Sequence, residues 1–128
     1  MFPPKPPQGA DPRMYFFLFL LTLGTTLGYQ GWTLLYTNFA VESAHLSAAD
    51  NGLVQSLREV PGLLGFLIIP LLLVMKEHRV AAVAALATGL GTALTGFFPS
   101  CVPVILTTLL MSFGFHFFEA VNQSLLLQ

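Results

Sequence analysis

Charged side chains are scarce in this chain. Five lysines and arginines and six aspartates and glutamates make up 9% of its 128 residues, whereas a soluble domain carries roughly a quarter. Hydrophobic residues make up 55% and the mean hydropathy is +0.75, which excludes disorder for most of the chain. The composition therefore argues against an ordinary water-soluble domain.

Cysteine and positive charge are scarce as well. The single cysteine, Cys101, excludes an internal disulfide and a cysteine-based zinc cluster. A net charge of −1 leaves no basic surface for phosphates, so we expect no nucleic-acid partner. Gly89 and Gly91 stand in an apolar run with no strand before them, unlike a phosphate-binding loop. We therefore expect no enzymatic activity, no cofactor and no metal site.

The few charges leave long gaps between them. Residues 14–41 and 80–118 contain no Asp, Glu, Lys or Arg, and residues 53–75 contain only Arg58 and Glu59. A helix needs about 20 predominantly apolar residues to cross a bilayer. The sequence predicts an all-α membrane protein in which residues 14–128 form four transmembrane helices. The predicted helices cover about residues 14–40, 48–75, 80–98 and 102–124.

Local signals mark several of these boundaries. Residues 1–13 contain five prolines and predict a disordered, Pro-rich tail followed by an uncleaved first helix rather than a signal peptide. Ser47 stands three residues before Asp50, which predicts a capping box at the start of the second helix. Pro61 predicts a kink inside that helix. Pro103 is suited to the first turn of the fourth helix.

The basic residues predict the orientation. Lys5 and Arg13 precede the first helix, and Lys76 and Arg79 lie between the second and third, whereas the two opposite loops contain no Lys or Arg. The positive-inside rule therefore predicts a cytoplasmic N-terminus in the plasma (cell inner) membrane.

Polar residues recur at helical spacing on the first helix. The stripe consists of Thr22, Thr26, Tyr29, Thr33 and Tyr36, at steps of 4, 3, 4 and 3. Such a stripe either hydrogen-bonds to other helices or lines a cavity, and the sequence leaves both readings open.

A second polar face predicts the site of greatest interest. Asn51, Gln55, Arg58 and Gly62 share one face of the second helix. Arg58 lies about 16 Å along the helix from Ser47, where a charge costs about 2.5–3.5 kcal/mol on insertion scales. Its role is either functional or that of a packing anchor. Neighbouring residues do not face each other on a helix, so we expect no direct pair with Glu59 and consider the Leu57 carbonyl, freed by Pro61, as an acceptor.

The fourth helix carries the third polar face, formed by Ser112, His116, Glu119 and Gln123, with Asn122 beside it. Glu119 and His116 are candidates for carrying a proton if they are desolvated. The alternative is that Glu119 is hydrated at the membrane boundary.

The third helix has no polar stripe, so we expect it to be peripheral. Ala85, Gly89 and Ala93 form a small-residue face for a neighbouring helix, and Gly24 and Gly28 form a G-x-x-x-G pair on the first helix.

With these features, the chain resembles the major facilitator superfamily. The segments that carry the resemblance are LSAADNGLVQSLREVPGLLG, GLGTALTGFFPS and MSFGFHFFEAVNQSL. The family's loop motif between its second and third helices is reduced here to the basic residues Lys76 and Arg79. The resemblance implies the first four of twelve helices, with the first and fourth lining the pathway, the second flanking it and the third outside.

The resemblance implies an N-terminal fragment of a secondary active transporter, which moves a small solute across the lipid bilayer by alternating access, with protons as a candidate coupling ion. Its partners would be the solute and the remaining helices, or another chain. Arg58 would pair with an anion or carboxylate. The candidate substrate and coupling residues are Arg58, Glu59, Glu119, His116, Asn122, Gln123, Gln55, Asn51, Tyr29 and Thr33.

Two alternatives stay open. One is a non-transporting four-helix membrane subunit that docks a partner through Gly24, Gly28, Ala85 and Gly89. The other is a small oligomeric multidrug exporter, although such exporters carry an acid in the first helix and this chain has none there.

Overall fold

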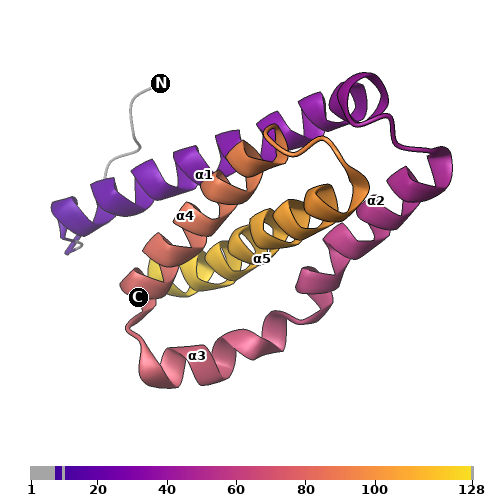
Figure 1. Cartoon of the computed structure of the whole chain (residues 1–128). Helices are drawn as coiled ribbons and strands as arrows, with labels where there is room; N and C mark the ends of the chain where they lie inside the picture. Colours follow the sequence, from indigo (N-terminus) through magenta and orange to yellow (C-terminus); the bar gives the residue numbers. More distant parts are fainter. Residues whose placement is uncertain (1–7, 10, 128) are drawn as a thin grey trace.

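Every regular element in the described residues, 8–9 and 11–127, is a helix in the computed structural model (Figure 1). The α-helices are α1 (Pro12–Asn38), α2 (Ala48–Leu63), α3 (Ile68–Val74), α4 (Glu77–Thr95) and α5 (Cys101–Leu126). A π-helical turn, Phe39–Ser43, extends α1, and a 3-10 turn, Gly65–Leu67, joins α2 to α3.

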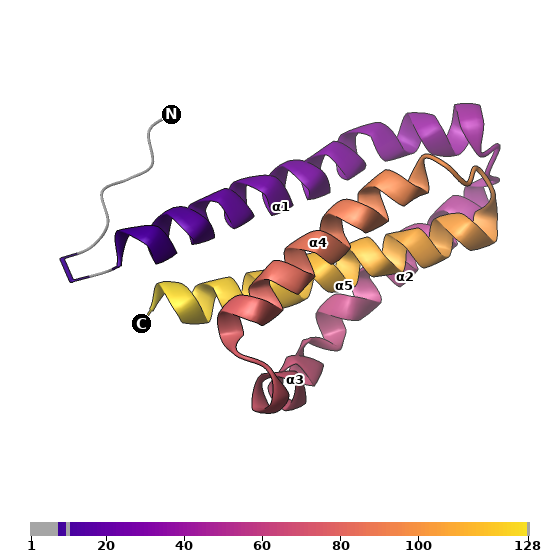
Figure 2. The same ribbon diagram turned by 60° about the vertical axis from the view of Figure 1, so that its left-hand side comes forward.

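The helices run alternately up and down. The start of α1, the turn from α3 into α4 and the end of α5 lie at one end of the bundle, and the α1–α2 and α4–α5 connections lie at the other (Figures 1 and 2). We call these the Lys76 end and the Ser47 end. Arg13 and Arg79 both belong to the Lys76 end, so the described basic residues that flank the helices share one end, as the sequence predicts, while Arg58 lies within α2.

Helix α1 begins two residues before its predicted start at Met14. The Asp11 side chain accepts a hydrogen bond from the Arg13 backbone amide at 2.9 Å, and Pro12 occupies the first helical position. Both residues are favoured there because an N-cap carboxylate satisfies a free amide and proline has no amide to satisfy. Residues 1–7 and 10 of the predicted disordered tail lie outside the described residues.

The predicted capping box at the start of α2 is confirmed. The Asp50 amide donates to the Ser47 hydroxyl at 3.1 Å, and the Ser47 amide donates to the Asp50 carboxylate at 3.2 Å. Two free amides at the helix terminus are therefore satisfied by side chains.

Ser47→Ala should lower the free energy of unfolding by about 1 kcal/mol, because it removes the hydroxyl that accepts from Asp50. Unfolding of the purified chain, followed by circular dichroism, measures the change. Ser56→Ala is the matched control, since the exposed Ser56 hydroxyl bonds only the Gly52 carbonyl of its own helix. Equal losses in the two variants would contradict the capping role.

The predicted single helix over residues 48–75 is wrong, because the structure divides it. Helices α2 and α3 meet at an angle of 46°, and the Leu67 amide donates to the Leu64 carbonyl in a 3-10 turn. Pro61 and Pro70 lack amides, so the carbonyls four residues before each of them lose their intrahelical donors. The predicted kink therefore falls three residues after Pro61.

The prediction that residues 80–98 form a peripheral helix is also wrong. Helix α4 lies between α1 and α5 in both views (Figures 1 and 2) and packs against both. Its buried face consists of Val80, Ala81, Ala84, Thr88, Gly91 and Thr95. Gly89 and Ala93 are exposed and Ala85 is half-buried, so two of the three residues of the predicted small-residue face point away from the bundle. Both faces of α4 are rich in small residues, and its partners decide which one is buried.

Helix α4 packs against its neighbours at glycines. A Cβ atom on Gly114 of α5 would lie 2.5 Å from the Ala84 carbonyl oxygen, and one on Gly91 would lie 2.4 Å from the Met111 amide nitrogen. Gly28 of α1 faces Thr88 and Thr92, as expected of a packing glycine, whereas Gly24 has no such neighbour within 4 Å. Of the predicted G-x-x-x-G pair, Gly28 therefore contributes to helix packing and Gly24 does not.

Among the described helices, α5 is long and apolar enough to cross a bilayer, and α2 with α3 is a second candidate if the bent pair counts as one span. Helices α1 and α4 have 27 and 19 residues and thus sufficient length. Threonine, glycine and glutamine lower their apolarity. Hydropathy thus supports one or two of the four predicted spans.

Candidate functional site

Two apolar clusters frame the candidate site. The cluster at the Ser47 end consists of Trp32, Tyr36, Ala40, Val54, Val104 and Met111. The cluster at the Lys76 end consists of Ile68, Val80, Ala81, Ala84, Phe118 and Val121. Arg58 lies on α2 between Val54 of the first cluster and Ile68 of the second, so its charge is held where α1, α2 and α5 meet.

Aromatic rings of α1 surround the Arg58 guanidinium. Its Cζ atom lies 6.0 Å from the centre of the Tyr29 ring and 5.5 Å from the centre of the Trp32 ring. A cation at these distances is attracted to the ring faces. The Arg58 side chain is 19% exposed, so the aromatic rings replace much of the water around it.

Glu59 is the ion-pair partner of Arg58. Arg58 Nε and Nη2 donate to Glu59 Oε1 at 2.9 and 2.6 Å. The expectation that these neighbours do not pair is therefore wrong. The spacing rule describes the directions in which side chains leave a helix, whereas the long arginine side chain bends along the helix surface. Both of its hydrogen bonds within the described part of the chain go to Glu59 and not to the Leu57 carbonyl.

Helix α5 closes the site from the third side. The Ser112 hydroxyl donates to the Arg58 backbone carbonyl, and the Phe115 ring stacks on Tyr29 with centres 3.9 Å apart. His116 lies against Gly62, where a Cβ atom would be 3.2 Å from His116 Cε1. Tyr29, Arg58 and His116, which the sequence predicted from separate helices, therefore lie around one junction. We call the set Tyr29, Trp32, Arg58, Glu59, Ser112, Phe115 and His116 the Arg58 junction.

Other predicted residues do not join this junction. Glu119 and Gln123 are exposed, one and two turns beyond Phe115 toward the Lys76 end. Thr33 is exposed and donates to the Tyr29 carbonyl of its own helix at 2.9 Å. Gln55 is half-buried. Asn51 and Asn122 are half-buried, and each has a buried side-chain oxygen without a hydrogen-bond partner in the described chain.

The polar stripe predicted on α1 is rotated relative to the face that the structure buries. The buried residues are Leu18, Thr25, Trp32 and Tyr36, whereas Thr26, Gln30 and Thr33 are exposed. Tyr36 is the one stripe residue that is fully buried, and Tyr29 and Thr22 are half-buried. On the buried face, the Trp32 ring stacks on Tyr36 with centres 4.3 Å apart.

Sequence reasoning missed Trp32 and Phe115. Trp32 follows Tyr29 by three residues, which places both rings on one side of α1. Phe115 precedes His116 and follows Ser112 by three residues. The signal that could have identified these two residues is the helical spacing of aromatic residues from the polar ones. It did not stand out because this apolar chain contains twelve phenylalanines.

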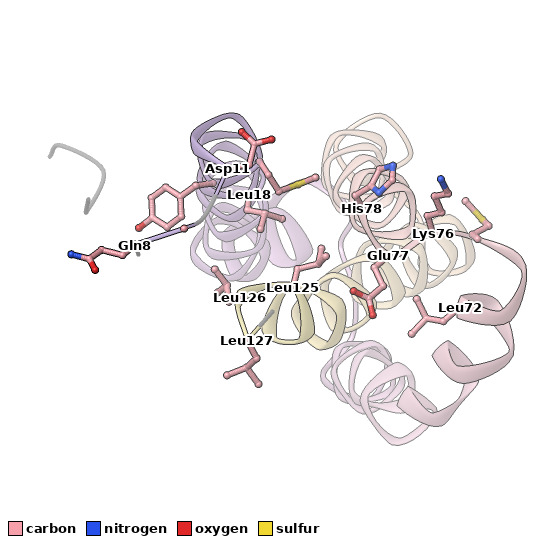
Figure 3. Close-up of a pocket in the computed structure, with 14 residues that line it drawn as sticks. Gln8, Asp11, Leu18, Leu72, Lys76, Glu77, His78, Leu125, Leu126 and Leu127 are labelled. Atoms are coloured by element: carbon pink, nitrogen blue, oxygen red, sulfur yellow. The ribbon is translucent and has the colours of Figure 1, made fainter. Parts of the chain in front are cut away.

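A separate cavity of about 940 Å³ opens at the Lys76 end (Figure 3). The start of α1, the α3–α4 turn and the end of α5 line it, and Figure 3 shows Leu18, Glu77 and Leu125 around it. The Ser124 hydroxyl donates to Glu77 Oε1 at 3.1 Å, which ties α5 to the start of α4. None of the predicted site residues lines this cavity.

The Arg58 junction can bind a negative charge. Its guanidinium is shielded on one side by aromatic rings and is neutralised by one carboxylate, that of Glu59, whose side chain is 59% exposed. Because the Glu59 carboxylate is the exposed partner of this pair, another anion can approach the same guanidinium donors from its side. No protein-family model, curated protein or solved structure matches this chain.

Proposed function

We propose that this chain forms four transmembrane helices of a secondary active transporter that resembles the major facilitator superfamily and moves a small solute by alternating access. One observation carries the proposal. The Arg58 guanidinium lies against the Tyr29 and Trp32 rings, in the middle of a long apolar segment. An ionisable side chain within a membrane segment usually marks a pathway for substrate or ions.

The outer surface supports a membrane location. Large apolar side chains are exposed along α1, α3, α4 and α5, among them Leu34 (76%), Leu73 (84%) and Leu86 (66%). A soluble monomer rarely exposes a contiguous apolar patch larger than a few hundred Å². Lipid tails would cover these side chains at no cost, and α1 and α4 would then cross the bilayer with α5.

The proposal assigns further roles. Alternating access requires two bundles that move around a central site, so the remaining helices, on this chain's own polypeptide or on another, are its partners. Glu119 is exposed on α5, and a carboxylate there would face protein or water rather than lipid. It is the candidate for proton coupling, with His116 as its neighbour one turn away.

Topology is tested by cysteine labelling. Cys101 is the only cysteine and lies at the Ser47 end, so a membrane-impermeant maleimide should label it in intact cells. In a Cys101→Ser background, His45→Cys should behave in the same way, whereas Lys76→Cys should react only after the membrane is permeabilised. Labelling of Lys76→Cys in intact cells, or recovery of the chain without detergent, would contradict the proposed membrane arrangement.

Transport is tested at the chromosomal locus. Deletion of the gene should lower the uptake of at least one member of a panel of radiolabelled small solutes. Uptake is measured in whole cells and compared with that of the parent strain. Unchanged uptake and unchanged efflux across the panel would remove the transporter assignment.

The subunit alternative is favoured by a specific observation. Gly24 and Gly89 are exposed, and added Cβ atoms there meet no neighbouring atom within 4 Å. Both therefore offer an open small-residue surface to a helix from another chain. The coding sequence beyond codon 128 distinguishes the transporter from the subunit. An open reading frame that encodes about eight further helices favours the transporter, whereas a stop codon favours the subunit.

A further inference from the structure

We infer that the Arg58 junction takes a carboxylate monoanion with an apolar body, and that Glu59 is the internal counter-ion which this ligand displaces. The inference deepens the proposed function and rests on it. It names the chemical class of the solute and assigns a moving part to the site.

The charge balance of α2 and α3 points to a monoanion. Between Asp50 at the helix start and Lys76 beyond its end, Arg58 and Glu59 are the two charged residues. Their pair is neutral in the structure. A ligand with one negative charge that replaces Glu59 keeps the guanidinium neutralised once. The displaced Glu59 carboxylate then leaves the segment with a net charge of −1, whereas a phosphate dianion would leave a net charge of −2.

The hydrogen bonds indicate which partner moves. The Arg58 backbone carbonyl accepts a hydrogen bond from the Ser112 hydroxyl, and the Arg58 Cζ atom lies against the rings of Tyr29 and Trp32. Glu59 is 59% exposed, whereas Arg58 is 19% exposed. Arg58 therefore stays in place. Glu59, the exposed partner, gives up this pair when a ligand carboxylate takes over Nε and Nη2.

The surroundings select the rest of the ligand. The Tyr29 and Trp32 rings lie next to the guanidinium, and the Phe115 ring stacks on Tyr29. An apolar group attached to the carboxylate gains contact with these rings, whereas a small hydrophilic anion gains none. Benzoate has both features and serves as the probe, with benzamide as its uncharged isostere.

The chain carries its own reporter for this experiment. Trp32 is the only tryptophan, and its ring centre lies 5.5 Å from Arg58 Cζ. Benzoate, titrated into the purified full chain in detergent or nanodiscs, should change the Trp32 emission with saturation. Benzamide and inorganic phosphate at equal concentrations should not, and Arg58→Gln should abolish the response to benzoate.

Glu59→Gln decides whether Glu59 competes with the ligand. Removing a competitor worth about 0.2–1 kcal/mol should lower the benzoate dissociation constant about 1.5- to 5-fold. Glu59→Asp, with a side chain one methylene shorter, should shift affinity in the same direction if the glutamine variant does not fold. Glu42→Gln, at the exposed Ser47 end, should leave the affinity unchanged.

The outcomes separate this inference from the proposed function. An unchanged or raised dissociation constant in both Glu59 variants would overturn the role of Glu59. A response to phosphate or benzamide equal to that of benzoate would overturn the ligand class. Either result leaves the labelling and uptake tests of the transporter intact, whereas failure of those tests with benzoate binding as described would overturn the transporter and keep the site.

Discussion

Gly114→Ala should lower the free energy of unfolding by about 2–3 kcal/mol, because the added Cβ would lie 2.5 Å from the Ala84 carbonyl oxygen and from the Thr88 amide nitrogen. Both contacts are with backbone, which cannot move without separating α4 from α5. The two helices share a large part of the bundle core, so the loss reaches both apolar clusters. Thermal unfolding of the purified chain in detergent, followed by circular dichroism, measures it.

Helix α4 provides a matched pair of controls. Gly91→Ala should cause a similar loss, because its Cβ would lie 2.4 Å from the Met111 amide nitrogen. Gly89→Ala, two residues earlier on the open face, should be neutral or stabilise by up to about 1 kcal/mol, since alanine favours a helix over glycine. Similar effects at the two positions would show that helix propensity rather than close packing governs α4.

Arg58→Ala at the chromosomal locus should reduce solute uptake to the level of a strain that lacks the chain. The substitution removes the one cation that α2 places among the aromatic rings of α1, and leaves an anionic solute without a partner there. The variant should still insert into the membrane, because losing a charge makes the segment more apolar. Uptake of the labelled solute, normalised to chain abundance in the membrane fraction, measures the effect.

Two further substitutions refine this result. Arg58→Lys keeps the charge and loses the planar set of donors that engages a carboxylate, so uptake should be intermediate. Arg13→Ala removes a cation at the exposed start of α1 and should leave uptake unchanged. Normal uptake in Arg58→Ala would remove Arg58 from the site.

The sequence singled out Arg58, Tyr29 and His116, which the structure brings to one junction, but it did not give their contacts. Arg58 stands out because a charge within an apolar segment is rare, and Tyr29 and His116 follow from helical spacing. The Arg58–Glu59 pair did not follow, because it depends on how the arginine side chain bends along α2. Trp32 did not follow either, because only the packing of α1 against α4 and α5 turns its ring toward the guanidinium.

The sequence by itself determined what depends on neighbouring residues. The Ser47–Asp50 capping box, the start of α5 close before Pro103 and the shared end of Arg13, Lys76 and Arg79 are set by short-range chemistry and by chain order. The tertiary structure alone decided the central position of α4, the 46° bend between α2 and α3, and the choice of Gly91 over Gly89 as the packing glycine. These features depend on which surfaces of distant helices fit together, and helical periodicity describes one helix at a time.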